Sequence, residues 1–333
     1  MWIHSARTDA AIAYLWVPFS AAAALAYRTP AALASVVAIT LLVSLIHQPL
    51  TLALIYGDPA QFALARRIFT FFPVVLLAAI VAGRVVSLTF VAVIAGLWNA
   101  EHTLMQRYGI ARIYGRKAGD GSIATERAML ISWLAFVLCF AAADTRTPKL
   151  LDRVDLGATN EGGIRILQSL RPWATSATLV AGLVVVAMTI RWWRTEKRLG
   201  VAGLTPKRRY LAATALLFVV MLVNPIVGLI GYVGSHAVEY FVIVHGALGR
   251  RYVGPVAEPG GLVGRVVRSP LRATGFVVVY VGVIGVALRL VQLRFPADLA
   301  NVILLTVGGM HVFFDGFIWK LRRPVVARSV AAE

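Results

Sequence analysis

The sequence has little cysteine, few charged residues and none of the common nucleotide-binding or hydrolase motifs. Its single cysteine, Cys139, excludes a disulfide framework and a thiolate-bound metal cluster. Charged residues make up only 14% of the 333 residues, against about 25% in soluble chains. A Walker A loop, a Gly-x-Gly-x-x-Gly fingerprint, a Gly-x-Ser-x-Gly elbow and a His-Glu-x-x-His pair are all absent. These absences argue against a conventional soluble nucleotide enzyme, serine hydrolase or zinc protease.

The chain is rich in long apolar runs, and 59% of its residues are hydrophobic, against roughly 45–50% in an average chain. A bilayer core of about 30 Å needs about 20 apolar residues per helix. The runs therefore predict an all-α, polytopic transmembrane helical bundle of about ten spans, forming a single integral membrane domain over residues 1–333. The expected spans are 10–27, 31–56, 68–83, 85–106, 128–143, 174–193, 208–224, 225–248, 272–292 and 298–319.

Basic residues set the expected orientation. The 33 lysines and arginines outnumber the 15 acidic residues, and they gather in every other junction between the expected spans. One such cluster, containing Arg107 and Arg112, follows the span 85–106. Under the positive-inside rule these junctions are cytoplasmic. We therefore expect a multi-pass protein of the inner (plasma) membrane with both termini cytoplasmic and the first span uncleaved. The clusters form no groove-reading motif, so no nucleic-acid partner is expected.

Two prolines mark expected irregularities within the apolar runs. Proline lacks a backbone donor and pushes the preceding residue away from helical conformation. Asn224-Pro225 therefore predicts a turn or a sharp kink inside one long apolar stretch. Gln48-Pro49 predicts a kink just after His47.

Ionisable side chains at membrane depth are costly and indicate functional sites. Five of the six histidines fall within the expected spans. The spans that carry buried ionisable groups are all even-numbered, so they all cross the membrane in the same direction. Their polar residues are His47, Glu101, His102, His236, Glu239, His311 and Asp315. We therefore expect these side chains to lie at a similar depth.

Helical spacing groups these residues by face. At about 100° per residue, His236, Glu239 and Tyr240 share one face, and His311 shares a face with Asp315. Asp315 is therefore expected either to be a metal ligand itself or to orient the imidazole of His311. Glu239, Asp315 and Tyr240 are the candidate catalytic groups. The alternatives are a structural partner for an arginine in the case of the two acids, and packing in the case of Tyr240.

Imidazole is the commonest side-chain metal ligand, and it is neutral when it binds, so several can share one apolar site. The predicted metal ligands are His47, His102, His236, His311 and Glu239. His245 is a weak candidate, because it lies nine residues after His236 and points about 180° away from it. The alternative for each single histidine is a hydrogen bond between helices.

The order of these elements resembles the Brp/Blh family of bacterial and archaeal membrane β-carotene dioxygenases. The matching elements are His47, His102, Asn224-Pro225 leading to His236, and the run from Leu305 to His311 with Asp315 and Lys320. The resemblance implies a helical bundle that holds one non-haem iron (Fe²⁺) through histidines and activates dioxygen to cleave a polyene. The family's third helix resembles His-x-x-x-His, and Tyr240 stands at its second position here. The implied ligands are therefore three histidines with Glu239, or a different set.

The sequence thus leads to a membrane-embedded metal oxidoreductase, dioxygenase-like, that acts on an apolar lipid, carotenoid or isoprenoid. His47, His102 and His236 would bind the metal, with Glu239 or His311 completing the set. A proton-coupled transporter or permease that uses buried His, Glu and Asp is the second hypothesis. A scaffold whose basic loops hold partners or anionic lipid is the third.

Overall fold

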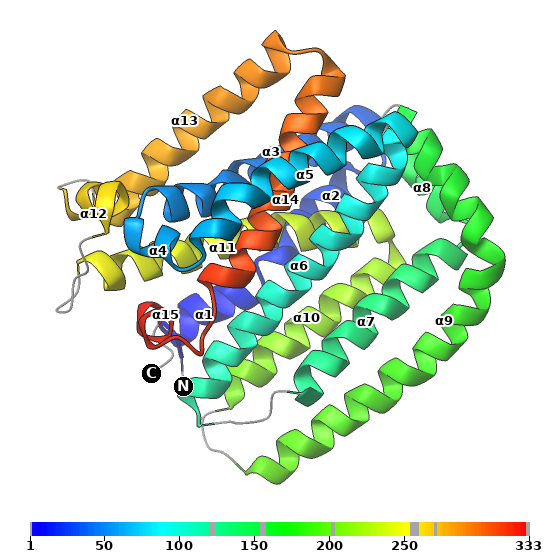
Figure 1. Ribbon diagram of the computed structural model, residues 1–333. Coiled ribbons are helices and arrows are strands. Elements are labelled where there is room, and N and C mark those ends of the chain that lie inside the picture. Colours follow the sequence, from blue (N-terminus) through cyan, green and yellow to red (C-terminus); the bar gives the residue numbers. More distant parts are fainter. Residues whose placement is uncertain are drawn as a thin grey trace. The chain divides into compact units, whose positions relative to one another are not determined.

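The computed structural model describes residues 2–119, 124–153, 158–200, 204–253, 260–269 and 272–330, and over these ranges it contains helices and no strand (Figure 1). The predicted all-α class is confirmed for this part of the chain. The helices are α1 (Ala6–Ala13), α2 (Trp16–Ala26), α3 (Pro30–Tyr56), α4 (Pro59–Ala63), α5 (Arg66–Val86), α6 (Leu88–Lys117), α7 (Ala124–Ala143), α8 (Thr147–Asp152), α9 (Ala158–Leu199), α10 (Thr205–Val223), α11 (Pro225–Tyr252), α12 (Gly261–Arg268), α13 (Arg272–Arg294), α14 (Ala297–Ile318) and α15 (Pro324–Ser329).

Within the described ranges, seven helices are long and apolar enough to cross a membrane, or up to eight if the bent pair α1–α2 counts as one span. The seven are α3, α5, α7, α9, α11, α13 and α14. Together with α1–α2 they coincide with eight of the ten expected spans. The segments 85–106 and 208–224 lie in α6 and α10, which are helical but are not among these candidates. A helical membrane protein is therefore indicated, while ten spans and cytoplasmic termini stay predictions.

The chain divides into two compact units. The first unit comprises Met1–Thr40 and Ala100–His236, and the second comprises Leu41–Asn99 and Ala237–Glu333. The divisions fall inside α3, α6 and α11, so each of these helices contributes residues to both units. The expectation of a single domain stays a prediction.

Residues 10–27 form two helices rather than the one continuous span expected from hydropathy. α1 and α2 meet at a bend of 40°. Pro18 has no N–H to donate to the carbonyl four residues earlier, at Tyr14. That carbonyl instead accepts from the N–H of Val17 at 3.0 Å. The proline thus accounts for the break, which a hydropathy scan does not register.

The predicted interruption at Asn224-Pro225 is confirmed. α10 ends at Val223, Asn224 is extended with φ −145° and ψ 103°, and α11 begins at Pro225. The Asn224 side chain caps α11, because its Oδ1 accepts from the backbone N–H of Ile226 and Val227 at 3.1 and 3.2 Å. At Gln48-Pro49, by contrast, α3 continues without interruption from Pro30 to Tyr56.

α10 and α11 approach each other closely beyond this turn, at a glycine. A Cβ placed on Gly228 would lie 2.6 Å from Met221 Cα and 2.7 Å from Met221 N. Both are backbone atoms, so the contact cannot be relieved by rotating a side chain. A glycine at this position is therefore required by the spacing of the two backbones.

We expect Gly228→Ala to lower the free energy of unfolding by about 1–3 kcal/mol, since the added methyl forces the two backbones apart. Gly249→Ala is the matched control on the same helix, because a Cβ at Gly249 meets nothing within 4 Å. That control is expected to be neutral or to stabilise by about 0.5–1 kcal/mol. Denaturant titration in detergent measures both, and equal effects would contradict the close approach.

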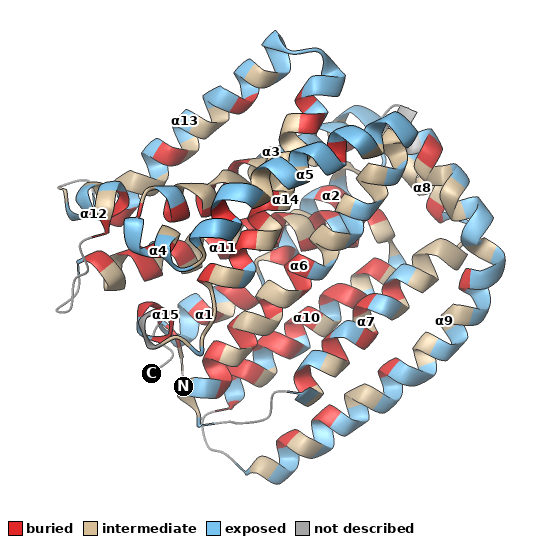
Figure 2. Cartoon of the chain, in the orientation of Figure 1, coloured by how far each residue is buried: buried red, intermediate tan, exposed pale blue. Residues whose placement is uncertain are grey.

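Helices differ sharply in how much of their surface is buried (Figure 2). In α11 the most apolar window is 67% buried, whereas in α5, α9 and α13 it is 11% buried. The exposed surface of the latter helices is apolar: Leu183 on α9 is 75% exposed and Val283 on α13 is 60% exposed. Apolar faces of this extent are typical of helices in contact with lipid.

Candidate metal centre

The second unit brings two of the predicted ligands, His47 of α3 and His311 of α14, into direct contact. Both side chains are fully buried. Their Nε2 atoms lie 3.1 Å apart, and the two rings meet edge to face with centroids 4.7 Å apart. These histidines are 264 residues apart in the chain, so the contact depends on how α3 and α14 associate.

Two glycines one turn before His311 give α14 close neighbours. A Cβ on Gly308 would lie 3.0 Å from Oε1 of Gln48, and a Cβ on Gly309 would lie 2.8 Å from Cδ2 of Leu76 on α5. Both atoms are the ends of flexible side chains, so a larger residue at either position would first displace the side chain of Gln48 or Leu76. The Gly-Gly pair thus leaves room for these two side chains beside α14.

The geometry of the pair fits a shared metal ion. Imidazole nitrogens bind first-row metals such as zinc at about 2.0–2.1 Å, so two nitrogens 3.1 Å apart can bind one ion at an N–metal–N angle of about 95–100°. The surroundings are apolar, since the buried core of the second unit includes Leu50, Phe69 and Phe314. The described residues also include buried groups of three histidine or aspartate side chains. In each group, the possible ligand atoms all lie within 4.8 Å of one another.

A network of hydrogen bonds holds the far side of the His311 ring. Nδ1 of His311 lies 2.7 Å from Oγ1 of Thr51, and the Thr51 hydroxyl donates to Oδ1 of Asp315 at 2.6 Å. Because that hydroxyl has one proton and gives it to the carboxylate, the bond to His311 requires Nδ1–H as donor. Nε2 of His311 therefore keeps its lone pair, which is what a metal ligand needs.

Tyr240 and Trp319 extend this network. The Tyr240 hydroxyl donates to Oδ1 of Asp315 at 3.0 Å and lies 2.6 Å from Oγ1 of Thr51. Nε1 of Trp319 donates to the Tyr240 oxygen at 3.3 Å. Asp315 thus contacts His311 mainly through Thr51, since its own Oδ2 is 3.9 Å from Nδ1. The carboxylate and the tyrosine singled out from the sequence thus lie together behind His311, although the helical spacing had grouped Tyr240 with His236 and Glu239.

Thr51 is a residue that the sequence analysis missed. It is fully buried and lies four residues after His47, so the two share a helical face. The i, i+4 spacing that relates Asp315 to His311 also relates Thr51 to His47, but a hydroxyl in an apolar helix is a weaker signal than an ionisable group.

We expect Thr51→Val to lower metal affinity by about 10–100-fold, the usual effect of losing a partner that orients a ligand. Valine has nearly the same shape but cannot accept from Nδ1, so His311 loses its preferred tautomer. Thr51→Ser should restore affinity to near the wild-type value. Competition with a chelator of known affinity measures all three proteins.

The control for this prediction is Thr40→Val on the same helix, where the buried hydroxyl donates to the Val36 carbonyl at 2.8 Å. Metal affinity should not change in this variant. Similar losses in Thr40→Val and Thr51→Val would contradict a specific role for Thr51.

The first unit contains a second pair of predicted ligands, His102 of α6 and His236 of α11. Both are buried, and their rings meet edge to face with centroids 5.2 Å apart. The backbone around them is tied together as well, because Nε2 of Gln106 donates to the His236 carbonyl at 3.1 Å and the Tyr232 hydroxyl donates to the Ala100 carbonyl at 2.8 Å. A single centre with all four histidines draws on residues of both units and stays a prediction.

Arg107 corrects the charge pattern used for orientation. We expected it in a cytoplasmic cluster after the span 85–106, but α6 continues to Lys117 and Arg107 is fully buried within it. Its guanidinium donates to Oγ of Ser235 at 2.5 Å and lies 5.7 Å from the centre of the Tyr232 ring. Hydropathy alone places the end of the helix where charged residues begin. The helix continues past Arg107 because a buried hydroxyl accepts a hydrogen bond from its guanidinium and an aromatic ring lies against it.

The remaining candidate site residues differ in how far their side chains are buried. Glu239 is fully buried on α11, whereas Glu101 is exposed, as its position one residue away from the His102 face predicts. His245 lies on the exposed side of α11 with its Nε2 3.0 Å from Oγ1 of Thr274. His245 therefore lies away from the histidine pairs, as the helical spacing predicted.

The chain matches no family model, no curated protein and no solved structure. The described residues nevertheless include buried histidine and aspartate groups that could hold a metal ion, and several helices are apolar enough to cross a membrane.

Proposed function

We propose that the protein is a membrane-embedded oxidoreductase that binds a first-row transition metal, Fe²⁺ in particular, through buried histidines. The observation that carries the proposal is the His47–His311 pair, whose Nε2 atoms lie 3.1 Å apart while Thr51 accepts from the opposite nitrogen of His311. Two buried imidazoles oriented in this way fit a ligand set better than they fit simple packing.

The residues around the His47–His311 pair would hold the ligand His311 in its orientation. Asp315 and Tyr240 fix the Thr51 hydroxyl, and Thr51 fixes the ring of His311. The apolar core around them keeps water out. A bound iron would supply activation of dioxygen at open coordination positions. The sequence adds His102, His236 and Glu239 to the proposed ligand set.

The proposed substrate is an apolar molecule such as a carotenoid, another isoprenoid or a fatty acyl chain. Such a molecule partitions into the bilayer, and the exposed faces of α9 and α13 are apolar. A polyene substrate is what the resemblance to the Brp/Blh family implies. Metal-dependent oxygen consumption that requires an added polyene would support this part of the proposal.

Metal analysis of purified protein tests the proposal directly. The protein is purified in detergent, stripped with a chelator, reconstituted with Fe²⁺ without oxygen and freed of unbound metal. We expect about one tightly bound ion per chain, the usual outcome for a site with a complete set of ligands. Well under one ion per chain, in protein whose circular dichroism shows the helices intact, would defeat the proposal.

A proton-coupled transporter is the second candidate, and one observation favours it. The apolar stretch 205–252 is broken at Asn224-Pro225, and broken helices often form substrate sites in transporters. Solute flux into proteoliposomes that depends on a pH gradient and disappears in Glu239→Gln would support this function. Oxygen consumption that depends on bound metal would support the oxidoreductase instead.

A further inference from the structure

The C-terminal end of α9 carries a row of exposed basic side chains, Arg191, Arg194, Lys197 and Arg198, here called the basic row. The row begins directly after Ile190, where the long apolar part of the helix ends. Nζ of Lys197 lies 5.3 Å from the centre of the exposed Trp193 ring. Tryptophan beside lysine and arginine at the end of an apolar helix is typical of the level of lipid headgroups.

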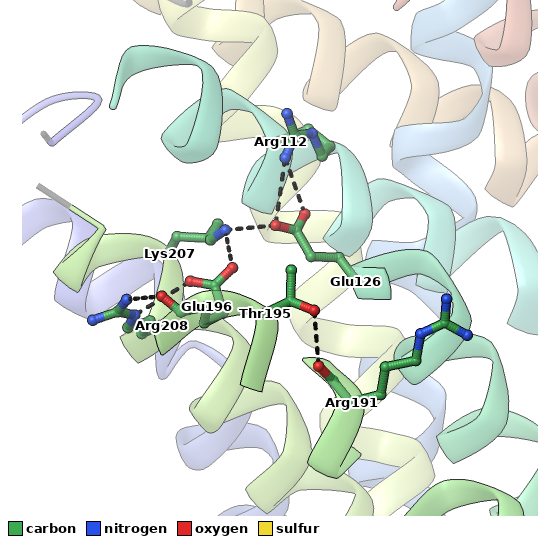
Figure 3. A network of polar contacts seen from close by, with 7 residues as sticks. All are labelled: Arg112, Glu126, Arg191, Thr195, Glu196, Lys207 and Arg208. Atoms are coloured by element: carbon green, nitrogen blue, oxygen red, sulfur yellow. Dashed lines mark hydrogen bonds and ion pairs between the residues drawn. The ribbon is translucent and has the colours of Figure 1, made fainter. Parts of the chain in front are cut away.

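The acidic residue within this segment, Glu196, is turned away from the basic row. Glu196 is fully buried, where it forms an ion pair with Nζ of Lys207, and its Oε2 lies 3.2 Å from Nε of Arg208. Lys207 in turn contacts Glu126 of α7 at 2.6 Å. Figure 3 shows Glu196 directed toward Lys207 and Arg208, while the guanidinium of Arg191 points away from this network. The exposed charge of the segment is therefore positive only.

An open apolar hollow lies between α7 and α9, in the part of α9 that precedes the basic row. Its volume is about 450 Å³, and it is lined by Ser132, Ala135, Ser176, Ala177, Val180, Ala181 and Val184. Small residues make up most of its lining, and Val180 in the lining is 63% exposed. A hollow of this composition offers space to an apolar chain and almost no polar group to a polar ligand.

The hollow shares one stripe of α9 with Arg191 and Arg198 of the basic row. Ala177, Val184, Arg191 and Arg198 follow one another at intervals of seven residues, which places them on the same face. At 1.5 Å per residue, Val184 and Ala177 lie about 10 Å and about 21 Å from Arg191 along the axis. One leaflet of a bilayer has a hydrocarbon depth of about 15 Å. The part of the hollow at Val184 therefore lies within one leaflet's depth of a headgroup at Arg191, and the hollow continues beyond that depth to Ala177.

We propose that this face of α9 binds an anionic phospholipid, with its phosphate on the basic row and one acyl chain in the hollow between α7 and α9. The occupant is a lipid and not a free anion, because the apolar hollow shares one stripe of α9 with Arg191 and Arg198, and its part at Val184 lies within one leaflet's depth of Arg191. Buried Lys207 supports the site indirectly, since it holds Glu196 away from the phosphate.

Lipid retention tests this proposal. The full-length protein is reconstituted in nanodiscs of phosphatidylcholine mixed with phosphatidylglycerol, and the lipids it retains are counted by native mass spectrometry. The wild type should retain phosphatidylglycerol in preference to phosphatidylcholine. In the variant with Arg191, Arg194, Lys197 and Arg198 all replaced by glutamine, that preference should fall at least about tenfold. A variant with Arg191→Lys, Arg194→Lys and Arg198→Lys should keep it.

The hollow is tested on its own. Ala177→Phe with Ala181→Phe fills it and should lower phosphatidylglycerol retention although the basic row is intact. Leu183→Phe with Val186→Phe is the matched control, because both side chains are exposed on α9 outside the hollow. The control should retain as much lipid as the wild type. Equal retention by the two variants would overturn the placement of the acyl chain.

Thermal unfolding measurements distinguish a bound lipid from a bound free anion. Phosphatidylglycerol should raise the midpoint of wild-type unfolding, whereas inorganic phosphate added to protein in phosphatidylcholine alone should not. An equal rise with inorganic phosphate would overturn the proposal. So would wild-type lipid preference in the glutamine variant, or the absence of any preference in the wild type.

Discussion

Replacing His311 by alanine is expected to abolish stoichiometric metal binding. The variant removes one of the two nitrogens that lie 3.1 Å apart, and it also removes the group that Thr51 orients. Because the loss of an orienting partner alone costs about 10–100-fold in metal affinity, loss of the ligand itself should cost more than about 100-fold. His47→Ala should have an effect of the same size. Metal content and chelator competition on purified protein measure both.

His245→Ala is the matched control for these variants, because His245 also belongs to the second unit but is exposed and contacts Thr274. It should keep wild-type metal content. Full metal content in His311→Ala would show that the pair is a hydrogen-bonded packing contact.

Replacing Lys207 by methionine is expected to produce the largest loss of stability. Lys207 is fully buried between two fully buried carboxylates, Glu126 and Glu196, which it joins by ion pairs. Without the ammonium group, two negative charges remain in an apolar interior. Removing one partner of a buried ion pair costs about 3–5 kcal/mol. Denaturant titration in detergent should show a decrease of this size in the free energy of unfolding.

The companion variants separate lost charge from lost packing. Adding Glu126→Gln and Glu196→Gln to Lys207→Met removes the uncompensated carboxylates, so it should recover a large part of the lost stability. Lys149→Met replaces an exposed lysine and should change stability by less than about 0.5 kcal/mol. A single Lys207→Met variant as stable as the wild type would contradict a stabilising role for this network.

The site shows where sequence reasoning succeeds and where it stops. Burial of His47, His102, His236 and His311 was predicted from their positions inside apolar runs, and all four are buried. From its i, i+4 spacing, Asp315 was expected either to be a metal ligand or to orient His311. The intermediary Thr51 could not be weighted in the same way, because a threonine in an apolar helix usually bonds to its own backbone. Only the approach of α3 to α14 gives Thr51 its partners.

Charge reasoning was less successful than hydropathy. Arg107 was counted as a loop charge because it lies at the edge of an apolar run, and Lys207 stands at the edge of another such run. In the structure both side chains are fully buried in helices. Arg107 donates a hydrogen bond to Ser235. Lys207 forms ion pairs with Glu126 and Glu196. A cluster of bases is therefore an unreliable marker of a loop when acidic or hydroxyl groups from other helices can pair with it.

The sequence by itself determined the helical class, the positions of the long apolar helices and the break at Asn224-Pro225. These features depend on stretches of about 20 neighbouring residues, or on the local chemistry of proline. The tertiary structure alone decided which histidines face each other, how Thr51 joins His311 to Asp315, and where Lys207 finds its carboxylates. Those contacts join different helices, so their geometry follows from helix packing, which no local pattern of residues specifies.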